Sequence, residues 1–393
     1  MKSFCCLFAI ALVAVAASAP ISNAAPPEAA KPAEGFTTVL FDGGSRDQWR
    51  IADCDVTVED GSLVLKKGNG YVQSHHRYRD FVLELDWKSR QKENYDSGIY
   101  FRADVPKGKR PWPTRYQINL KQGDEGNVKV LPGAASTGLV KPGEWNHFKL
   151  TAVGSRAELE INGKPAWKVD GVEPRTGYIG LQAEVPLGGQ FEFRDIRVTE
   201  LGYTSLFDGK DLAGWEGASE AADKCWKVED GLLVCNGERG PWLRSAVQYG
   251  DFNLRLAYKL KPGGNSGVYL RVPKGGAHRG LELSGGPSGI EVQLLDDADK
   301  RYASIEPYQS AASLYALAAA KEHVARPAGE WNTLEINCRG PNYRVTHNGA
   351  VVIDATSKEL PELARRELRG YLGLQNHSEH VWFRNLRVGP AEE

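Results

Sequence analysis

The chain has 393 residues, which at roughly 100–200 residues per domain suggests two domains and excludes a single small core. Its 49 Lys and Arg residues against 50 Asp and Glu residues give a net charge of -1, so the positive field that gathers nucleic acid is missing. With 43 Gly, 10 Trp and 1 Met, the composition favours turns and rigid aromatic surfaces, and we expect a mostly β protein.

Residues 1–24 have the layout of a secretory signal peptide. Lys2 precedes an apolar run, and small residues at Ser22-Asn23-Ala24 favour cleavage after Ala24. The run is shorter than the roughly 20 residues that span a bilayer, so we expect no membrane span after cleavage. Residues 25–35 then form an Ala/Pro-rich leader, and we expect a secreted or periplasmic protein.

The rest of the chain contains one pattern twice. Trp49 recurs as Trp215, with the same offset of 166 that separates the two Leu-Phe-Asp-Gly motifs at residues 40 and 206. Further motifs recur in the same order: Ser97-Gly98-Ile99-Tyr100-Phe101-Arg102 with Ser266-Gly267-Val268-Tyr269-Leu270-Arg271, Gly143-Glu144-Trp145-Asn146 with Gly329-Glu330-Trp331-Asn332, and Gly177-Tyr178-Ile179-Gly180-Leu181-Gln182 with Gly370-Tyr371-Leu372-Gly373-Leu374-Gln375. We therefore predict two homologous domains, 36–201 and 202–390.

Each copy is rich in strand signals. Residues 81–87 alternate apolar and polar side chains, the period of a half-buried strand. Turns that hairpins favour stand at Asp60-Gly61, Asn162-Gly163, Asp230-Gly231 and Asn348-Gly349. Together they predict an all-β chain in which each copy is a two-sheet sandwich or jelly roll.

The second copy carries an insertion. The offset between the copies rises from 169 at Ser97 to 186 at Glu144, so 17 extra residues lie between these markers (186 − 169 = 17). The insertion includes a Gly-rich loop at residues 275–289 and residues 310–321, whose Ala and Leu content predicts a short helix. Long loops on a rigid sandwich are where sites are usually built.

Two cysteines flank a predicted hairpin. The pairs 225/235 and 228/232 both sum to 460, which makes Cys225 and Cys235 cross-strand neighbours. A disulfide is feasible in an oxidising compartment, and buried free thiols are the alternative. The spacing fits neither a metal site nor a cysteine nucleophile.

A polar strand in the second copy is the first candidate for chemistry. In residues 290–294, Glu291 and Gln293 share one face while the residues between them face the other way. The first copy has Gln117 and Asn119 at these positions, and Glu184 where the second copy has His377. An acid/base site, if there is one, therefore lies in the second copy.

Other polar residues are less specific. Arg102 and Arg271 stand at matching positions, and their guanidinium groups suit sugar hydroxyls, a carboxylate or a developing oxyanion. Asp296, Asp297 and Asp299 offer oxygens that suit Ca²⁺, but they lack the spacing of an EF-hand. Solvated turn acids are the favoured interpretation, so no cofactor is assigned and a divalent cation stays an open alternative.

The second copy resembles the 3-keto-disaccharide hydrolase family, formerly a domain family of unknown function. The resemblance rests on six ordered motifs: residues 206–215, 263–271, 291–293, 313–315, 328–332 and 374–377. It implies two tandem concanavalin-like jelly rolls and an exported protein that cleaves oxidised disaccharides or glycosides. It also implies that residues 313–315 line a pocket as irregular chain, contrary to the helix predicted from propensity.

Such a substrate permits proton abstraction from C2, elimination of the C1 oxygen and hydration. Our hypothesis assigns Glu291 and His377 as base and acid, in undecided order, and places Arg271 near the developing oxyanion. The residues expected to orient an oligosaccharide or glycoside are Gln293, Asp296, Tyr315, Gln375 and Asn376.

Two rival hypotheses remain. In one, the chain is a non-catalytic carbohydrate-binding module in which exposed Trp112 or Trp242 stacks on a glycan, a role that suits the first copy in particular. In the other, it is an ordinary glycoside hydrolase that cleaves a plain disaccharide, although the carboxylate motif of laminarinase-like sandwiches is missing.

Overall fold

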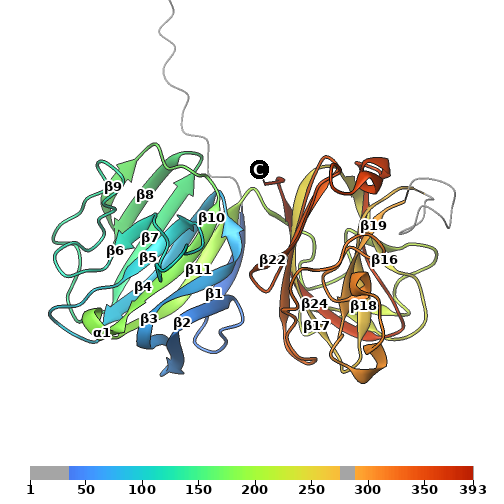
Figure 1. Ribbon diagram of the computed structural model, residues 1–393, viewed down its shortest axis with the longest axis horizontal. Helices are drawn as coiled ribbons and strands as arrows, with labels where there is room; N and C mark the ends of the chain where they lie inside the picture. Colours follow the sequence, from blue (N-terminus) through green and yellow to red (C-terminus); the bar gives the residue numbers. More distant parts are fainter. Residues whose placement is uncertain (1–34, 275–287, 393) are drawn as a thin grey trace, which may run out of the picture. The chain divides into compact units, whose positions relative to one another are not determined.

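The computed structural model describes residues 35–274 and 288–392, and its ribbon is drawn in Figure 1. The expected signal peptide, all but the last residue of the leader and most of the Gly-rich loop lie outside the described residues. Within the described part, no helix is long and apolar enough to cross a membrane.

The first copy contains a single antiparallel sheet of eleven strands. Its elements are β1 (Gly35–Phe41), β2 (Trp49–Glu59), β3 (Ser62–Tyr78), β4 (Phe81–Ser89), β5 (Gly98–Ala103), β6 (Gln117–Asn119), β7 (Asn146–Val153), β8 (Arg156–Ile161), β9 (Lys164–Val169), β10 (Gly177–Glu184), α1 (Val185–Gly188) and β11 (Phe191–Leu201). The strand order is β6-β5-β10-β3-β11-β4-β7-β8-β9, with β1 beside β11 and β2 beside β3.

The second copy divides its strands between an eight-stranded and a five-stranded sheet. Its elements are β12 (Thr204–Ser205), β13 (Trp215–Gly217), β14 (Trp226–Glu229), β15 (Leu232–Asn236), β16 (Leu243–Tyr249), β17 (Phe252–Leu260), β18 (Asn265–Val272), β19 (Ile290–Leu295), η1 (Lys300–Tyr302), η2 (Pro307–Gln309), β20 (Asn332–Arg339), β21 (Asn342–His347), β22 (Ala350–Ala355), η3 (Pro361–Arg365), β23 (Gly370–Leu374) and β24 (His380–Gly389). The five-stranded sheet has the order β13-β16-β23-β18-β19.

One strand explains why the first copy has a continuous sheet. β3 runs for 17 residues, and it pairs with β11 through Leu63 and Val64 and with β10 from residue 69 onward. Its counterpart in the second copy is split into β15 and β16 by Gly237, Gly240 and Pro241. Proline cannot donate to a ladder and glycine weakens a strand, so the two sheets separate there.

The predicted strands and hairpin turns are present. Side chains of β4 alternate between buried and half-buried, and the buried ones join the core of the first copy. All four Asn-Gly and Asp-Gly turns close two-residue hairpins, and both residues of each turn have positive φ: Asp60 (47°) and Gly61 (74°), Asn162 (51°) and Gly163 (74°), Asp230 (50°) and Gly231 (74°), Asn348 (46°) and Gly349 (81°). These angles are those of a type I′ turn. The all-β sandwich architecture is therefore confirmed.

The cysteine hairpin differs by one residue from the prediction. β14 pairs with β15 so that Trp226, and not Cys225, faces Cys235. A two-residue loop at Asp230-Gly231 requires Glu229 to pair with Leu232, and the sum of paired positions is then 461. Cys225 and Cys235 are buried free thiols, as is Cys338.

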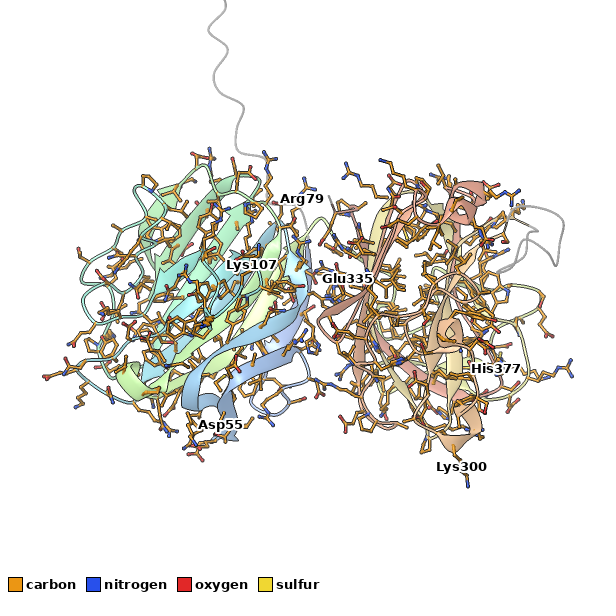
Figure 2. All side chains as sticks on the ribbon, in the orientation of Figure 1. Asp55, Arg79, Lys107, Lys300, Glu335 and His377 are labelled. Atoms are coloured by element: carbon orange, nitrogen blue, oxygen red, sulfur yellow. The ribbon has the colours of Figure 1, made fainter. Side chains whose placement is uncertain are left out.

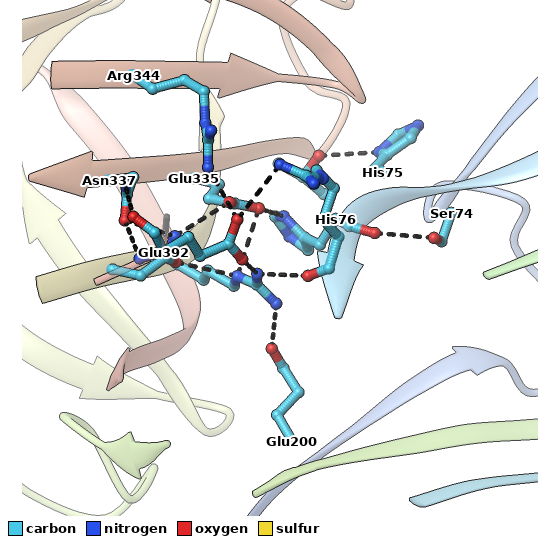
Figure 3. A network of polar contacts seen from close by, with 12 residues as sticks. Ser74, His75, His76, Glu200, Glu335, Asn337, Arg344 and Glu392 are labelled. Carbon is cyan, nitrogen blue, oxygen red and sulfur yellow. Dashed lines mark hydrogen bonds and ion pairs between the residues drawn. The ribbon is translucent and has the colours of Figure 1, made fainter. Parts of the chain in front are cut away.

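A buried network of charged side chains joins the last strand of the first copy to the second copy (Figure 3). Glu200 of β11 accepts a hydrogen bond from Arg255 of β17. Arg255 also lies 3.4 Å from Glu335 and 2.9 Å from Glu392, and His76 Nδ1 lies 3.1 Å from Glu335 Oε2. All five side chains are buried, so each charge depends on its partners for stabilisation.

Candidate active site

Strand β19 places Glu291 and Gln293 on the outer face of the five-stranded sheet, as predicted. β19 pairs with β18 so that Tyr269 faces Glu291 and Gly267 faces Gln293. The side chains of Val292 and neighbouring alternate residues join the core on the opposite face. The alternation in the sequence therefore separates a polar outer face from an apolar inner face.

The segment after β19 is irregular, and the predicted helix at residues 310–321 is wrong. Its backbone pairs with β19: Ala312 N donates to Gln293 O at 2.8 Å, and Tyr315 N donates to Glu291 O at 2.9 Å. Ala312 and Ala316 have φ values of 62° and 58°, which no helix contains. Hydrogen bonding to an otherwise open strand edge outweighs the helix propensity of alanine. The irregular chain that the resemblance implies for residues 313–315 is confirmed.

A pocket of about 210 Å³ lies on this outer face. Four of the residues singled out from the sequence meet in it: Gln293, Tyr315, Gln375 and His377. The other lining residues are Asn265, Leu295, Tyr302, Ile305 and Gln309. His377 is exposed and stands at the surface of the second copy in Figure 2.

Hydrogen bonds within the lining orient the pocket's amides and hydroxyls. Gln293 Nε2 donates to Asn265 Oδ1 at 3.0 Å, and Gln309 Nε2 donates to the Tyr315 hydroxyl at 3.1 Å. The Tyr302 hydroxyl donates to the Gly263 carbonyl at 3.0 Å. A neutral polar lining of this kind suits the hydroxyl groups of a sugar.

Glu291 lies behind this lining and is 1% exposed. Its Oε1 atom accepts a hydrogen bond of 2.8 Å from Gln375 Nε2. A Cβ atom at Gly267 would lie 2.5 Å from the same oxygen, so only glycine leaves room for the carboxylate there. Glu291 therefore contacts the pocket through Gln375, whereas His377 faces it directly.

Arg271 is not part of the pocket, and the expectation that it meets a developing oxyanion is wrong. It is 1% exposed and donates to the carbonyls of Gly250 (2.8 Å) and Gly340 (2.6 Å), to Tyr343 and to Asp251. Its φ of 50° turns the backbone so that the side chain reaches two loops at the end of the sheet. Because these partners occupy the guanidinium, Arg271 is a structural residue.

Asp296 and Asn376 are also missing from the pocket lining. Asp296 Oδ2 accepts from Gly263 N at 2.7 Å, and Asn376 Nδ2 donates to Glu238 O at 2.9 Å. Neither side chain lines the cavity, so the structure does not bring these two predicted residues to the pocket.

The neighbouring aspartates act as turn acids. Asp297 Oδ2 accepts from Ala311 N, and Asp299 Oδ1 accepts from Arg301 N at the start of η1. In residues 35–274 and 288–392, no group of three or more His, Cys, Asp or Glu side chains is arranged to hold a metal ion.

The same face of the first copy has different chemistry. Gln117 Nε2 donates to Gln182 Oε1 at 2.5 Å, and Gln182 Nε2 donates to Glu184 at 2.9 Å. Burial, followed by the charge of Asp96, raises the pKa of Glu184. Asp96, which stands where the second copy has Asn265, forms an ion pair of 3.1 Å with Lys121. The first copy thus replaces a neutral pocket with a chain of amides and charges.

The tryptophans proposed for stacking are not exposed platforms. Trp112 is half-buried and donates to the carbonyls of Gly70 (3.0 Å) and Ala183 (3.2 Å). Trp242 is also half-buried and packs edge-on against Tyr269, with 5.2 Å between ring centroids.

Five lining residues did not emerge from the sequence reasoning. Asn265 immediately precedes a repeated motif, and its difference from Asp96 is a signal that the sequence does contain. Tyr302, Ile305 and Gln309 come from the inserted segment, where two short 3₁₀ turns at Lys300–Tyr302 and Pro307–Gln309 carry them over the sheet edge. Whether these side chains point into the pocket depends on the tertiary fold, which no local sequence pattern specifies.

Comparison with known proteins identifies relatives of both copies. A family model described as a 3-keto-alpha-glucoside-1,2-lyase-like domain matches residues 36–199 and again residues 202–389. A 3-keto-disaccharide hydrolase from Bacteroides thetaiotaomicron is 28% identical over 228 residues, which cover 48% of this chain and 78% of the relative.

Solved structures are also similar to parts of the chain. A candidate glycosyl hydrolase from Parabacteroides distasonis is 25% identical, covers 49% of this chain and 94% of its own, and has a TM-score of 0.43. A carbohydrate-binding module from Bacillus subtilis is 16% identical, covers 40% of this chain and 96% of its own, and has a TM-score of 0.31.

Proposed function

Because the chain belongs to the 3-keto-alpha-glucoside-1,2-lyase-like family, we propose that its second copy cleaves 3-keto-glycosides or 3-keto-disaccharides. The observation that carries the proposal is the neutral polar pocket in which Gln293, Tyr315, Gln375 and His377 meet. The name of the Bacteroides relative supports the same substrate class. We also propose that the protein acts outside the cytoplasm, because its first 24 residues have the layout of a signal peptide.

The proposed reaction depends on the ketone at C3 of the sugar. A base removes the proton from C2, and the electron pair of that bond forms an enolate with the C3 oxygen. The enolate then returns its electrons, C1 and C2 become doubly bonded, and the bond from C1 to the leaving oxygen breaks. That oxygen takes a proton, and water finally adds its hydroxyl to C1 and a proton to C2. No oxocarbenium ion is needed, unlike ordinary glycoside hydrolysis.

We assign the proton transfers to His377, whose imidazole faces the pocket. An imidazole nitrogen can accept a proton and donate it again, so one ring can take the C2 proton and return it to the leaving oxygen. Glu291 is a positioning residue that holds the Gln375 amide at 2.8 Å. The amides of Asn265 and Gln293 are the donors that we assign to the enolate oxygen in place of Arg271.

The test compares a 3-keto-disaccharide with the same disaccharide before oxidation, using the full chain in D₂O. We expect cleavage of the oxidised compound alone, and one solvent-derived deuterium at C2 of the released 3-keto sugar. Unreacted substrate recovered from the same reaction corrects for exchange that the ketone undergoes by itself. Mass spectrometry measures the deuterium content of the product and of the recovered substrate.

The rival hypotheses predict other results. Cleavage of the unoxidised disaccharide, or product without deuterium at C2, would favour an ordinary hydrolase. Saturable binding of the unoxidised sugar without turnover of either compound would favour a binding module.

A further inference from the structure

The first copy has a groove of its own on the outer face of its sheet. The groove has a volume of about 410 Å³ and lies between the paired strands β2 and β3 and the loop that follows β5. The strands contribute Arg50, Tyr71 and Gln73, and the loop contributes Val105, Pro106 and Arg110. It lies at the β2 side of the sheet, whereas the second-copy pocket lies at the β19 side, so the two cavities are not equivalent.

A cross-strand pair distinguishes this groove from the matching position in the second copy. Arg50 faces Gln73 across β2 and β3, and Glu216 faces Arg244 across β13 and β16. In the second copy the pair is closed, because Arg244 donates to Glu216 at 2.6 Å and stacks on Tyr371. In the first copy no acid stands opposite Arg50 across the two strands, and within residues 35–274 and 288–392 its guanidinium forms no ion pair.

A second arginine faces the same groove from the loop. Within the described residues, neither Arg50 nor Arg110 forms a side-chain hydrogen bond or an ion pair. The loop also carries Lys107 and Lys109 (Figure 2 labels Lys107), and its neighbouring acid Asp104 is 3.8 Å from Lys107. Unpaired arginines in a hollow attract a planar anion, and bidentate hydrogen bonding makes carboxylate a fitting one.

The floor of the groove offers contacts to a sugar ring. Gln73 is 4% exposed, and no described residue forms a hydrogen bond with its side-chain amide. Tyr71 supplies an aromatic edge that is held against Tyr100 at 5.6 Å. Asp53 also lines the groove and offers an acceptor for hydroxyl groups.

The loop is anchored and does not fold into the groove. Trp112 packs against the cluster of Tyr71, Tyr100 and Ala103, and its indole nitrogen donates to the carbonyls of Gly70 and Ala183. A wall fixed in this way keeps Arg110 across the groove from β2 before any ligand arrives, which lowers the ordering cost of binding.

We propose that this groove is a binding site for a uronic acid unit of an acidic glycan. Arg50 and Arg110 take the carboxylate, Gln73 and Asp53 hydrogen-bond the ring hydroxyls, and Tyr71 contacts the ring. The site goes beyond the proposed activity and does not rest on it, since none of these residues belongs to the second copy.

The test is isothermal titration calorimetry of the full chain with tetragalacturonate and with its methyl ester, at about 0.15 M NaCl. The ester keeps every hydroxyl and removes the charge, so we expect it to bind about ten- to a hundredfold more weakly. We expect the substitutions Arg50→Gln and Arg110→Gln each to weaken the binding of tetragalacturonate by a similar factor. Gln73→Glu should also weaken the binding, because the new carboxylate pairs with Arg50 and repels the ligand.

Two controls separate a built site from general attraction to a basic loop. Arg115→Gln removes a charge from the same loop at an exposed residue that does not line the groove, and should leave affinity within about threefold. His377→Ala should bind tetragalacturonate as tightly as the unaltered protein, whether or not turnover is lost. Equal binding of acid and ester, equal losses in Arg115→Gln and Arg50→Gln, or no binding of tetragalacturonate would each overturn the proposal.

Discussion

In the first copy, Gln117 and Gln182 join across the outer face of one continuous sheet, whereas in the second copy Glu291 and Gln375 occupy the same register positions. At the end of the same sheets, Arg102 and Arg271 form equivalent hydrogen bonds to loop carbonyls. Arg102 donates to the carbonyls of Arg79 and Gly154, and Arg271 donates to those of Gly250 and Gly340. The arginines that hold the fold are therefore shared between the copies, and the polar residues on the outer face of the sheet have diverged.

This comparison distinguishes a structural role from a catalytic role for a residue that occurs in both copies. An arginine kept in both copies looks like a functional group when only the sequence is known. Its position in two copies with unlike outer faces instead indicates a role that both copies need, which is the closure of loops at the sheet end. Residues that differ between the copies, such as His377 and Glu184, are better candidates for chemistry.

The largest effect is expected from His377→Ala. Loss of a proton-transfer residue should lower kcat on a 3-keto-disaccharide by about 10²- to 10⁴-fold. Glu184→Ala changes the matching position of the first copy and should leave kcat unchanged. Glu291→Gln should lower kcat less, by about ten- to a hundredfold, because it acts through Gln375. An unchanged kcat in both His377→Ala and Glu291→Gln would contradict the roles assigned to His377 in proton transfer and to Glu291 in positioning Gln375.

Arg255→Met should produce the next largest effect. It leaves Glu200, Glu335 and Glu392 buried without a shared cation, and should lower the free energy of unfolding by about 3–5 kcal/mol. Urea unfolding followed by tryptophan fluorescence measures the change. Arg339→Met, at an exposed position, is the matched control and should change stability by about 0.5 kcal/mol or less. A loss no larger than that of the control would contradict a stabilising role for the network.

Arg102→Met and Arg271→Met test whether the two arginines are equivalent. Each substitution leaves part-buried carbonyls at one sheet end without their donor, and each should lower the free energy of unfolding by about 3 kcal/mol. The readout is the same urea titration, together with turnover by the folded protein. A loss of turnover in Arg271→Met without a loss of stability would return Arg271 to the active site.

The last prediction concerns the pH dependence of the free energy of unfolding. Burial lowers the pKa of His347 to about 3, and its Nε2 lies 2.9 Å from the Tyr258 hydroxyl. Between pH 3 and the ordinary pKa of histidine, the unfolded chain binds a proton that the folded chain does not, so stability falls as pH decreases through this window. His347→Ile introduces the residue that the first copy has as Ile161. It should reduce the slope of unfolding free energy against pH by about 1.4 kcal/mol per pH unit. An unchanged slope would show that His347 binds its proton equally in the folded and unfolded states, so that burial does not lower its pKa.

Much of the fold was predictable because its signals are local. The alternation along residues 81–87 and the four Asx-Gly turns specify strands and hairpins through period and φ alone. The register of the Cys225 hairpin was wrong by one residue because the loop length, and not the cysteine spacing, decides which residues pair.

The candidate site was predictable only in part. Gln293, Tyr315, Gln375 and His377 do meet, since the sheet brings β19 and the end of β23 to one face. The pocket lining does not include Arg271, Asp296 or Asn376, because proximity to a motif in the sequence does not determine where a side chain points. The helix predicted after β19 does not form, because the edge of β19 competes for the backbone hydrogen bonds of this segment.

By itself, the sequence determined the duplication, the β class and the copy that carries His377 and Glu291. These follow from repeated motifs, residue periodicity and residue identity, each of which is a property of the chain. Only the tertiary structure decided that Glu291 lies behind Gln375, that Arg271 closes loops, and that Arg50 lines a groove and forms no ion pair among the described residues. Those facts depend on which distant backbone groups compete for each side chain, and that competition exists only once the sheets have formed.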